Sequence, residues 1–263
     1  EAAGIYHANP KAVYLPHQKA LGHYDKTFAE RLYLFEERPG GNTSEFKDYD
    51  YTEKTVNTLD LLEKLTKSHK HVIDQKAVWR ARLFDVLIGD WDRHDDQWRW
   101  ASFEDGDKTI YRPVPRDRDQ VFFKNDGLLD YISSRPFIAP GLRKFEKDID
   151  FYPGLIFNAS HFDRSFLHAT ALEEVLEIAR SLQAEITDDV IDKAFERWPE
   201  KIRTLDGQEI KEKLKSRRAK LVEYARFHHN YINREVTVPG TNDDDKFEIE
   251  LLPNDKMHVR VYH

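Results

Sequence analysis

Alternating apolar and polar positions predict two short strands near the N-terminus. They occupy residues 11–16 (KAVYLP) and residues 30–39 (ERLYLFEERP), with a loop between them. The following stretch, residues 40–55, is polar and begins with two glycines, which is typical of a connection. The chain therefore opens with a small pair of strands and a loop.

Helical spacing follows in two places. Residues 58–70 (TLDLLEKLTKSHK) begin with a cap signal at Thr58, and a longer helix is predicted from about residue 75 to residue 88, ending at Gly89. In the longer helix the spacing of apolar residues predicts one buried stripe, made of Val78, Ala81, Phe84 and Leu87 or Ile88.

A β-hairpin is predicted directly after the second helix. Residues 97–115 alternate on both sides of the turn signal Asp105-Gly106. Because a hairpin brings its two ends together, residues 92–97 and 117–119 are expected to face each other.

The C-terminal half is mainly helical until its last thirty residues. Residues 127–158 are aromatic and interrupted by prolines, with little periodicity, and helices are expected at 171–184, 188–198 and about 208–231. Alternation then predicts three strands, 234–240, 246–252 and 257–263, with turns at TNDDD and PNDK. The basic stretch 211–220 is expected to be a solvated helix face, with an anionic lipid surface as the alternative.

Composition limits the class of protein. The chain has 263 residues, 40% of them hydrophobic and 13% aromatic, which is enough for one large domain, or a main domain with an appendage, and a real core. Its net charge of −7 disfavours a nucleic-acid partner. No cysteine is present, which excludes disulfides, zinc–thiolate sites and thiol catalysis.

No apolar run approaches the roughly 20 residues of a membrane-spanning helix, and no signal peptide is seen. The sequence begins at Glu1 rather than methionine, so we expect a piece of a longer protein.

Two acidic segments flank the predicted hairpin. The first, residues 87–100 (LIGDWDRHDDQWRW), contains four aspartates, and the second is residues 115–120 (PRDRDQ). Carboxylates so close together resist burial unless a cation or a reaction requires them. The order of features matches the layout of a kinase catalytic segment: a helix, a loop with Asp92 and His94, the polar Gln97, and a hairpin that ends in acidic residues. Such oxygen ligands suit magnesium.

These residues resemble the atypical kinase-like families: phosphatidylinositol kinases, HipA-type toxin kinases, CotH-type spore-coat kinases and secretory-pathway casein kinases. The resemblance implies ATP and Mg²⁺ or Mn²⁺ as cofactors. It places Asp92 at the catalytic-base position, with His94 beside it as a catalytic or bracing residue, and Gln97 at a metal-ligand position. It implies Asp117 or Asp119 as the second metal-binding carboxylate and does not decide between the two.

The resemblance also covers the nucleotide side of the site. The strand LYLFEERP is similar to the strand and hinge that line an adenine pocket, which implies Phe35, Glu36 and Glu37 as cofactor-binding residues. The sequence departs from kinases in having no G-x-G-x-x-G loop and no lysine in a V-A-I-K-like strand. We therefore expect a poor kinase or an inactive one.

Four motifs resemble a domain of bacterial envelope proteins that lies between a calcineurin-like metallophosphoesterase module and a surface-antigen-type outer-membrane barrel. They are AAGIYHANPKAVYLP, LYLFEERP, GDWDRHDDQWRW and YRPVPRDRDQVFFKNDGLL. This resemblance implies a place in the bacterial cell envelope, periplasmic or associated with the outer membrane. It also implies a parent polypeptide with a membrane barrel as partner.

Two other interpretations compete. In the first, arginines neutralise the acidic segments as an ion-pair network without chemistry, pairing Arg93, Arg99, Arg112, Arg116 and Arg118 with Asp90, Asp92, Asp95, Asp117 and Asp119. In the second, GDWDRH belongs to a metallophosphoesterase, but the D-x-H, GNH and G-H-x-H motifs of such enzymes are missing.

Together these patterns predict an α+β chain with a truncated protein-kinase-like fold. Residues 1–57 form a strand-and-hinge remnant, 58–232 a mainly helical lobe with the metal-site hairpin, and 233–263 a small antiparallel β-unit or the start of another domain. The functional hypothesis is an atypical kinase-like phosphotransferase domain. The alternative is a non-catalytic structural or interaction module of a larger, outer-membrane-associated metallophosphoesterase protein.

Overall fold

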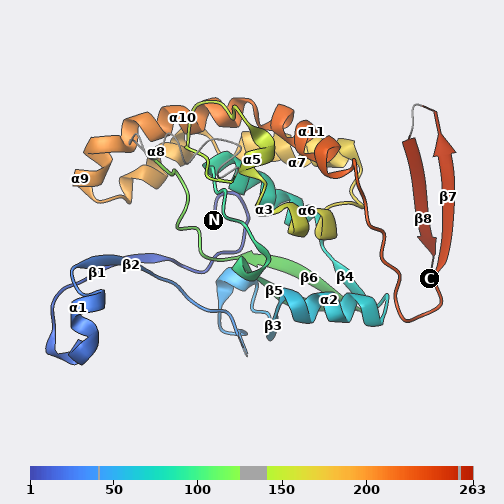
Figure 1. Cartoon of the computed structure of the whole chain (residues 1–263), viewed down its shortest axis with the longest axis horizontal. Coiled ribbons are helices and arrows are strands. Elements are labelled where there is room, and N and C mark those ends of the chain that lie inside the picture. The colour runs from blue at the N-terminus through green and yellow to red at the C-terminus, as the bar shows by residue number, and fades with distance from the viewer. Residues whose placement is uncertain (41, 125–140, 254–255, 263) are drawn as a thin grey trace.

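The computed structural model describes residues 1–40, 42–124, 141–253 and 256–262. The chain is of the mixed α+β class: a layer of helices covers a small sheet, and two separate two-stranded units extend from this body (Figure 1). The predicted division at residues 57 and 232 stays a prediction.

The predicted hairpin is confirmed and forms the centre of a four-stranded sheet. Strands β5 (Trp98–Asp105) and β6 (Lys108–Pro115) pair in antiparallel fashion around Gly106. Strand β3 (Lys54–Asn57) joins β5 in antiparallel fashion, and β4 (His71–Ile73) joins β6 in parallel, which gives the order β3-β5-β6-β4.

Helix α2 (Thr58–Lys67) lies at the predicted position, but its cap is a different residue. The Asn57 side chain accepts a hydrogen bond from the Asp60 N–H at 2.8 Å, so Asn57 is the cap. The hydroxyl of Thr58 instead donates to the Asp95 carbonyl at 2.8 Å and accepts from the Trp100 indole at 3.2 Å. Thr58 therefore connects α2 to the first acidic segment.

Helix α3 (Gln75–Ile88) has the predicted boundaries. The Asp74 side chain caps its first turn, and Gly89 ends it in the left-handed conformation with a φ of 73°. The predicted stripe is buried except for half-buried Phe84, but Trp79 and Asp85 on other faces are buried too. The helix is covered nearly all round because it lies between β6 and the helices α7, α10 and α11.

The helical layer agrees with the predicted 171–184 and 188–198 helices, at α7 (Leu172–Glu185) and α8 (Asp188–Glu196). The predicted 208–231 helix is two helices, which meet at Lys220. These two helices are α10 (Gln208–Ala219) and α11 (Leu221–Ile232). The layer also contains short elements that were not predicted: α5 (Tyr152–Leu155), α6 (Ser160–Phe166), α9 (Glu200–Ile202) and a π-helical turn (Arg203–Gly207).

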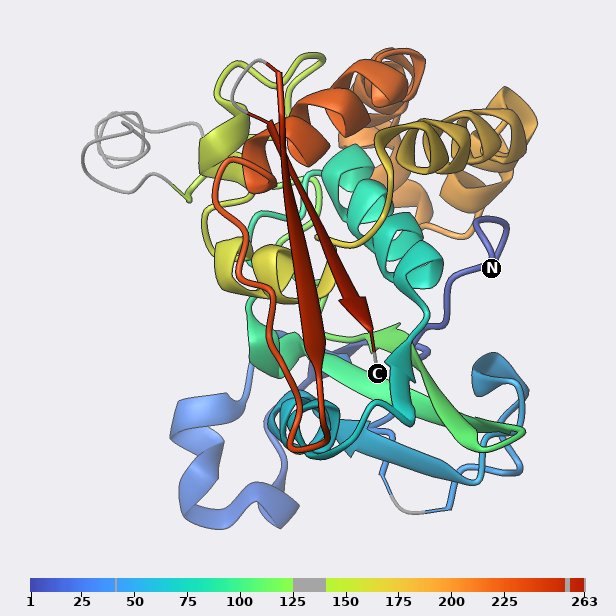
Figure 2. The ribbon, with the colours of Figure 1, turned by 90° about the vertical axis from the view of Figure 1, so that its right-hand side faces the viewer.

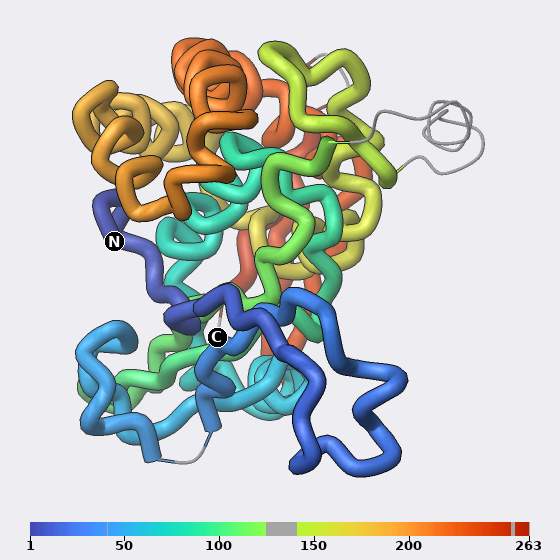
Figure 3. Tube along the Cα trace, turned by 90° about the vertical axis from the view of Figure 1, so that its left-hand side faces the viewer, coloured from blue at the N-terminus to red at the C-terminus, as the bar shows by residue number. Residues whose placement is uncertain are grey.

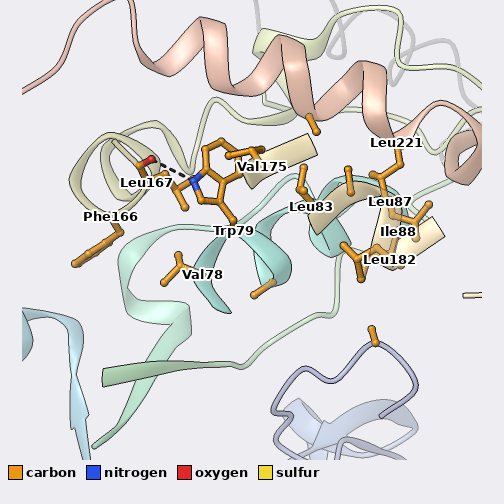
Figure 4. Close-up of a cluster of buried hydrophobic side chains, with 14 of the residues drawn as sticks. Val78, Trp79, Leu83, Leu87, Ile88, Phe166, Leu167, Val175, Leu182 and Leu221 are labelled. Carbon is orange, nitrogen blue, oxygen red and sulfur yellow. Dashed lines mark hydrogen bonds between the residues drawn. The ribbon is translucent and has the colours of Figure 1, made fainter. Parts of the chain in front are cut away.

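The main core forms where α3 meets α7 and α11, and Figure 4 shows its side chains. Trp79 lies at its centre and satisfies its indole N–H by donating to the Leu167 carbonyl at 3.2 Å. Leu83 and Leu87 of α3 and Val175 and Leu182 of α7 complete this cluster and are fully buried. This packing fixes the direction of α3 and so the place where its last residues emerge.

The basic stretch 211–220 is not simply a solvated face. Arg217 is buried and donates to the Val86 carbonyl at 3.0 Å and to the Glu146 carbonyl at 2.8 Å. Lys213, Lys215 and Arg218 pair with acidic side chains. The stretch therefore binds the helical layer to the end of α3.

Two two-stranded units extend from the body. Strands β1 (Lys11–Leu15) and β2 (Arg31–Phe35) pair as an antiparallel ribbon, and a 3-10 helix (Lys19–Tyr24) and α1 (Asp25–Phe28) connect them at its far end (Figure 3). Strands β7 (Lys246–Leu252) and β8 (Lys256–Tyr262) form a long hairpin that stands apart from the helices in Figure 1 and lies in front of them in the view of Figure 2.

One of the three strands predicted in the tail, at residues 234–240, does not form. These residues contain Pro239 and pair with no strand in the described part of the chain. Part of the predicted irregular segment 127–158, half of the PNDK turn and residue 263 lie outside the described residues. No helix in the ranges that the structure describes is long and apolar enough to cross a membrane.

Candidate active site

In each of the two acidic segments the chain crosses between the helical layer and the sheet (Figure 1). Residues 89–97 lead from α3 to β5, and residues 116–124 lead from β6 back toward the helices. The Arg116 N–H donates to the Gln97 carbonyl at 2.9 Å, and the Phe122 N–H donates to the Ile88 carbonyl at 3.2 Å. The segments therefore run side by side, as the hairpin predicts.

Asp92 is half-buried and is held by amide groups only. Its two carboxylate oxygens accept hydrogen bonds from the Asn158 side-chain amide at 3.0 Å and from the Gln97 side-chain amide at 3.5 Å. Asn158 lies between α5 and α6, and sequence reasoning missed it because it belongs to a segment without periodicity. These neutral partners leave the negative charge of Asp92 uncompensated.

Gln97 is buried and only half satisfied. Its amide nitrogen donates to Asp92, but its side-chain oxygen has no hydrogen-bond partner in the described part of the chain. Buried polar oxygens are almost always paired, so this one requires an explanation. A cation bound beside Asp92 would supply the missing partner, which fits the chemistry of Mg²⁺.

Asp117 and Asp119 lie on the opposite segment and are exposed. Asp117 has a φ of 53°, in a region that non-glycine residues rarely adopt, and its N–H donates to Glu36 at 3.0 Å. Partial burial, then the charge of Asp117, and also that of Asp92, raise the pKa of the Asp119 carboxyl. The Asp119 carboxylate is therefore close enough to Asp117 and Asp92 to be influenced by their charges.

The site is not a closed metal cage. Within the described ranges no three His, Asp or Glu side chains come close enough together to hold a metal ion. Magnesium in phosphotransferases is commonly held by one or two carboxylates together with nucleotide phosphates and water. Asp92, Gln97 and the acids at 117 and 119 suit that second arrangement.

His94 contributes no bracing contact. Its side chain is exposed and makes no hydrogen bond or ion pair within the ranges that the structure describes. The neighbouring Arg93 is fully buried and joins the two segments instead.

The three residues predicted to line an adenine pocket have different surroundings. Glu36 accepts hydrogen bonds from Arg116 at 3.2 Å and from the Asp117 N–H, so it lies beside the acidic segment. Phe35 is 68% exposed at the end of β2. Glu37 accepts hydrogen bonds from other residues, and its N–H donates to the Ala8 carbonyl at 2.8 Å. One backbone donor that an adenine ring could use is therefore occupied.

An ion-pair network exists, but its members differ from those predicted. Of the predicted pairs only Arg93 with Asp90, at 3.5 Å, is present among the described residues. Arg118 pairs with Asp85 at 2.8 Å and Arg116 with Glu36. Sequence reasoning missed Asp85 because an acidic residue inside a helix resembles a solvated one. Arg112 pairs with Asp50 and Asp74, and Asp95 contacts His161.

Asp85 is the centre of this network. Its carboxylate is fully buried and contacts Arg82 at 3.1 Å, Arg93 at 3.4 Å and Arg118 at 2.8 Å. Burial alone would raise the pKa of Asp85, but the three guanidinium groups hold it below its usual value. A second buried acid, Asp163, pairs with Arg82 at 2.6 Å and with His228, which lower its pKa to about 2 against the effect of burial.

Two cavities lie elsewhere in the described part of the chain. One of about 230 Å³ is lined by residues such as Tyr6, Asp50, Asp74 and Arg112, and an apolar one of about 440 Å³ lies beneath the far end of the β1–β2 ribbon. Neither is lined by a residue of the two acidic segments. Comparisons of the chain with protein-family models, curated proteins and solved structures found no match.

Proposed function

We propose that the chain is an atypical kinase-like domain that binds a nucleotide together with Mg²⁺ or Mn²⁺ at the two acidic segments. One observation carries the proposal. Asp92, Asp117 and Asp119 have no arginine or lysine partner within the described residues, whereas buried Asp85, Asp90 and Asp163 are each paired with arginine. The three buried acids each contact an arginine within the fold, and Asp92, Asp117 and Asp119 are available to a ligand.

The proposal assigns separate roles to Asp92, to its two amide partners and to the metal-binding acids. Asp92 orients the acceptor hydroxyl and accepts its proton, and Asn158 and Gln97 fix its carboxylate. Gln97, through its unpaired oxygen, and Asp117 or Asp119 bind the metal. The metal would neutralise charge on the transferred phosphoryl group. His94 is exposed on the same loop, and Glu36 lies between the strand pair and the second segment.

Nucleotide binding is expected to be stronger than turnover. The sequence has neither the glycine-rich loop nor the strand lysine that hold ATP phosphates in kinases, and the Glu37 N–H is already bonded. We therefore expect metal-dependent nucleotide binding with little or no phosphotransfer. The sequence resemblance further suggests a parent polypeptide in the bacterial envelope.

Thermal unfolding with Mn²⁺ and a non-hydrolysable ATP analogue tests the proposal. We expect the two together, but neither alone, to raise the melting temperature, because the phosphates complete the metal site. Asp92→Ala should lessen or abolish the rise, and so should at least one of Asp117→Asn and Asp119→Asn. Asp96→Asn is the matched control, since it removes an exposed carboxylate of the same loop. The proposal fails if the wild-type chain shows no rise, or if Asp92→Ala responds as the wild type does.

A non-catalytic interaction module is the second candidate, and the β7–β8 hairpin favours it. The register places six apolar residues on one face of this two-stranded sheet: Phe247, Ile249, Leu251, Met257, Val259 and Val261. Leu251 is 81% exposed, and isolated hairpins of this kind are marginally stable in water. Absence of nucleotide binding would leave this candidate in place.

A further inference from the structure

Arg93 contacts both acidic segments at the level of the backbone. From its place beside Asp92, its guanidinium donates to the Arg116 carbonyl at 2.6 Å and to the Asp117 carbonyl at 3.5 Å on the opposite segment. It also donates to the Gln97 carbonyl at 3.3 Å on its own segment. One side chain therefore spans the two crossings at the point where the candidate ligands lie.

The guanidinium also contacts two buried acids and an aromatic ring. It contacts Asp85 at 3.4 Å and Asp90 at 3.5 Å, and it packs over the face of Trp98 with 4.6 Å between its central carbon and the ring centroid. Arg93 is fully buried, so these contacts are not screened by water. Arg118 anchors the second segment to the same Asp85, with hydrogen bonds of 2.8 and 3.0 Å.

We propose that Arg93 is a positioning residue, which sets the distance between the Asp92–Gln97 loop and the 116–119 loop and so forms the metal–nucleotide site. This inference rests on the proposed function. The branched guanidinium is essential to it, because several donors in one plane reach carbonyls in different directions. A lysine presents a compact charge on a flexible stem and cannot bind the same set.

The contacts distinguish positioning from simple stabilisation. Arg82 is equally buried and also binds Asp85, but its other partner is Asp163 of α6. Arg82 donates to no carbonyl of either acidic segment among the described residues. The two arginines therefore share burial and the central carboxylate, but only Arg93 of the two contacts the acidic segments.

The experiment compares R93K with R82K in the full chain. The measurements are the Kd for Mn²⁺ with the ATP analogue, amide hydrogen exchange across residues 88–98 and 115–122 without ligand, and the unfolding midpoint in urea. We expect R93K to raise the Kd at least about tenfold, the usual scale for groups that orient metal ligands. It should also accelerate exchange in both segments. R82K should lower the unfolding midpoint but leave Kd and segment exchange near wild type.

Two results overturn the inference. One is a folded R93K protein with wild-type Kd and exchange, and the other is an R82K protein that changes both as R93K does, which would make Arg93 a stabilising residue only. If the wild type does not bind Mn²⁺ with the ATP analogue, the proposed function fails. Amide hydrogen exchange in R93K and R82K then tests by itself whether Arg93 holds the two segments together.

R118K tests the same anchor if R93K does not fold. Arg118 has a side chain 17% exposed and holds the second segment to Asp85, so its replacement should be better tolerated. We expect the same direction of change in Kd and in exchange at residues 115–122. Wild-type values in R118K would contradict the inference.

Discussion

Asp85 and Asp92 lie seven residues apart and have opposite surroundings. Asp85 is buried among three guanidinium groups, whereas Asp92 accepts hydrogen bonds only from side-chain amides. A carboxylate with cationic partners is committed to the fold, since removing one partner of a buried pair costs about 3–5 kcal/mol. A half-buried carboxylate without a cation is free to take one from a ligand. This contrast separates scaffold from candidate site.

Asp90 gives the molecule a distinctive pH dependence. Burial, opposed by Arg93 and assisted by the charge of Asp85, raises the pKa of Asp90 to about 6 in the folded chain. An unfolded aspartate has a pKa of about 4, so the folded state binds the proton more tightly between these values. The contribution of Asp90 to stability is therefore complete below about pH 4 and lost as the pH rises through about 6, by at most about 3 kcal/mol.

Urea unfolding at a series of pH values checks this prediction with the variant Asp90→Asn. The amide carries no charge at any of these pH values, so the variant should lose the decline between pH 4 and pH 6. Asp96→Asn, an exposed neighbour, should keep it. Parallel pH profiles for Asp90→Asn and the wild type would contradict the assignment.

The sequence predicted the candidate ligands but not their supports. The hairpin pattern brings Asp92, Gln97, Asp117 and Asp119 together, and their proposed roles come from the resemblance to kinase-like families. Their supports come from distant segments instead: Asn158 reaches Asp92 across 66 residues, and Asp163 reaches Arg82 across 81. Such contacts depend on tertiary packing, which no local pattern of apolar and polar residues encodes.

At the scale of elements, long periodic segments were predictable and short ones were not. Helix α3 was predicted at about its observed position because its helical apolar spacing stops at Gly89, and β5–β6 because alternating positions flank a turn. Strands β3 and β4 have four and three residues, too few to show alternation, and form by pairing with the hairpin. The break at Lys220 leaves no mark in the apolar pattern.

Gly89 is predicted to be essential to the end of α3. Its φ of 73° strains any other residue, and an added Cβ would lie 2.7 Å from a ring carbon of Phe145 and 2.9 Å from Arg217. We expect Gly89→Ala to lower the free energy of unfolding by about 2–4 kcal/mol, because strain and the steric clash add. It should also weaken metal–nucleotide binding, since the first acidic segment begins here.

Gly106→Ala is the matched control. Gly106 also has a positive φ, of 63°, but no atom lies within 4 Å of an added Cβ. This variant should show only the strain, about 1 kcal/mol, and leave binding unchanged. Equal losses of stability in urea unfolding would mean that the contacts of Gly89 with Phe145 and Arg217 do not matter.

At the scale of the whole molecule, the body and its extensions differ in how they are stabilised. The body has a continuous core from α3 to the helical layer, whereas β1–β2 and β7–β8 keep large apolar side chains exposed, such as Leu32 at 74% and Leu251 at 81%. Contacts between the tail and α2 involve Asn242 and Asp243, which precede the β7–β8 hairpin. The hairpin therefore contributes little to the stability of the body.

Removal of residues 246–263 is expected to leave the body intact. A chain that ends at Asp245 keeps the contacts of Asn242 and Asp243 with α2 and loses only a hairpin whose apolar face is exposed. We expect its melting temperature to stay within about 2–4 °C of the full chain, the shift that about 1 kcal/mol produces at this size. Its Mn²⁺–nucleotide affinity should be unchanged, because both acidic segments lie in the body. A larger fall in melting temperature would show that the hairpin packs against the body, and its apolar face would then no longer favour an interaction module.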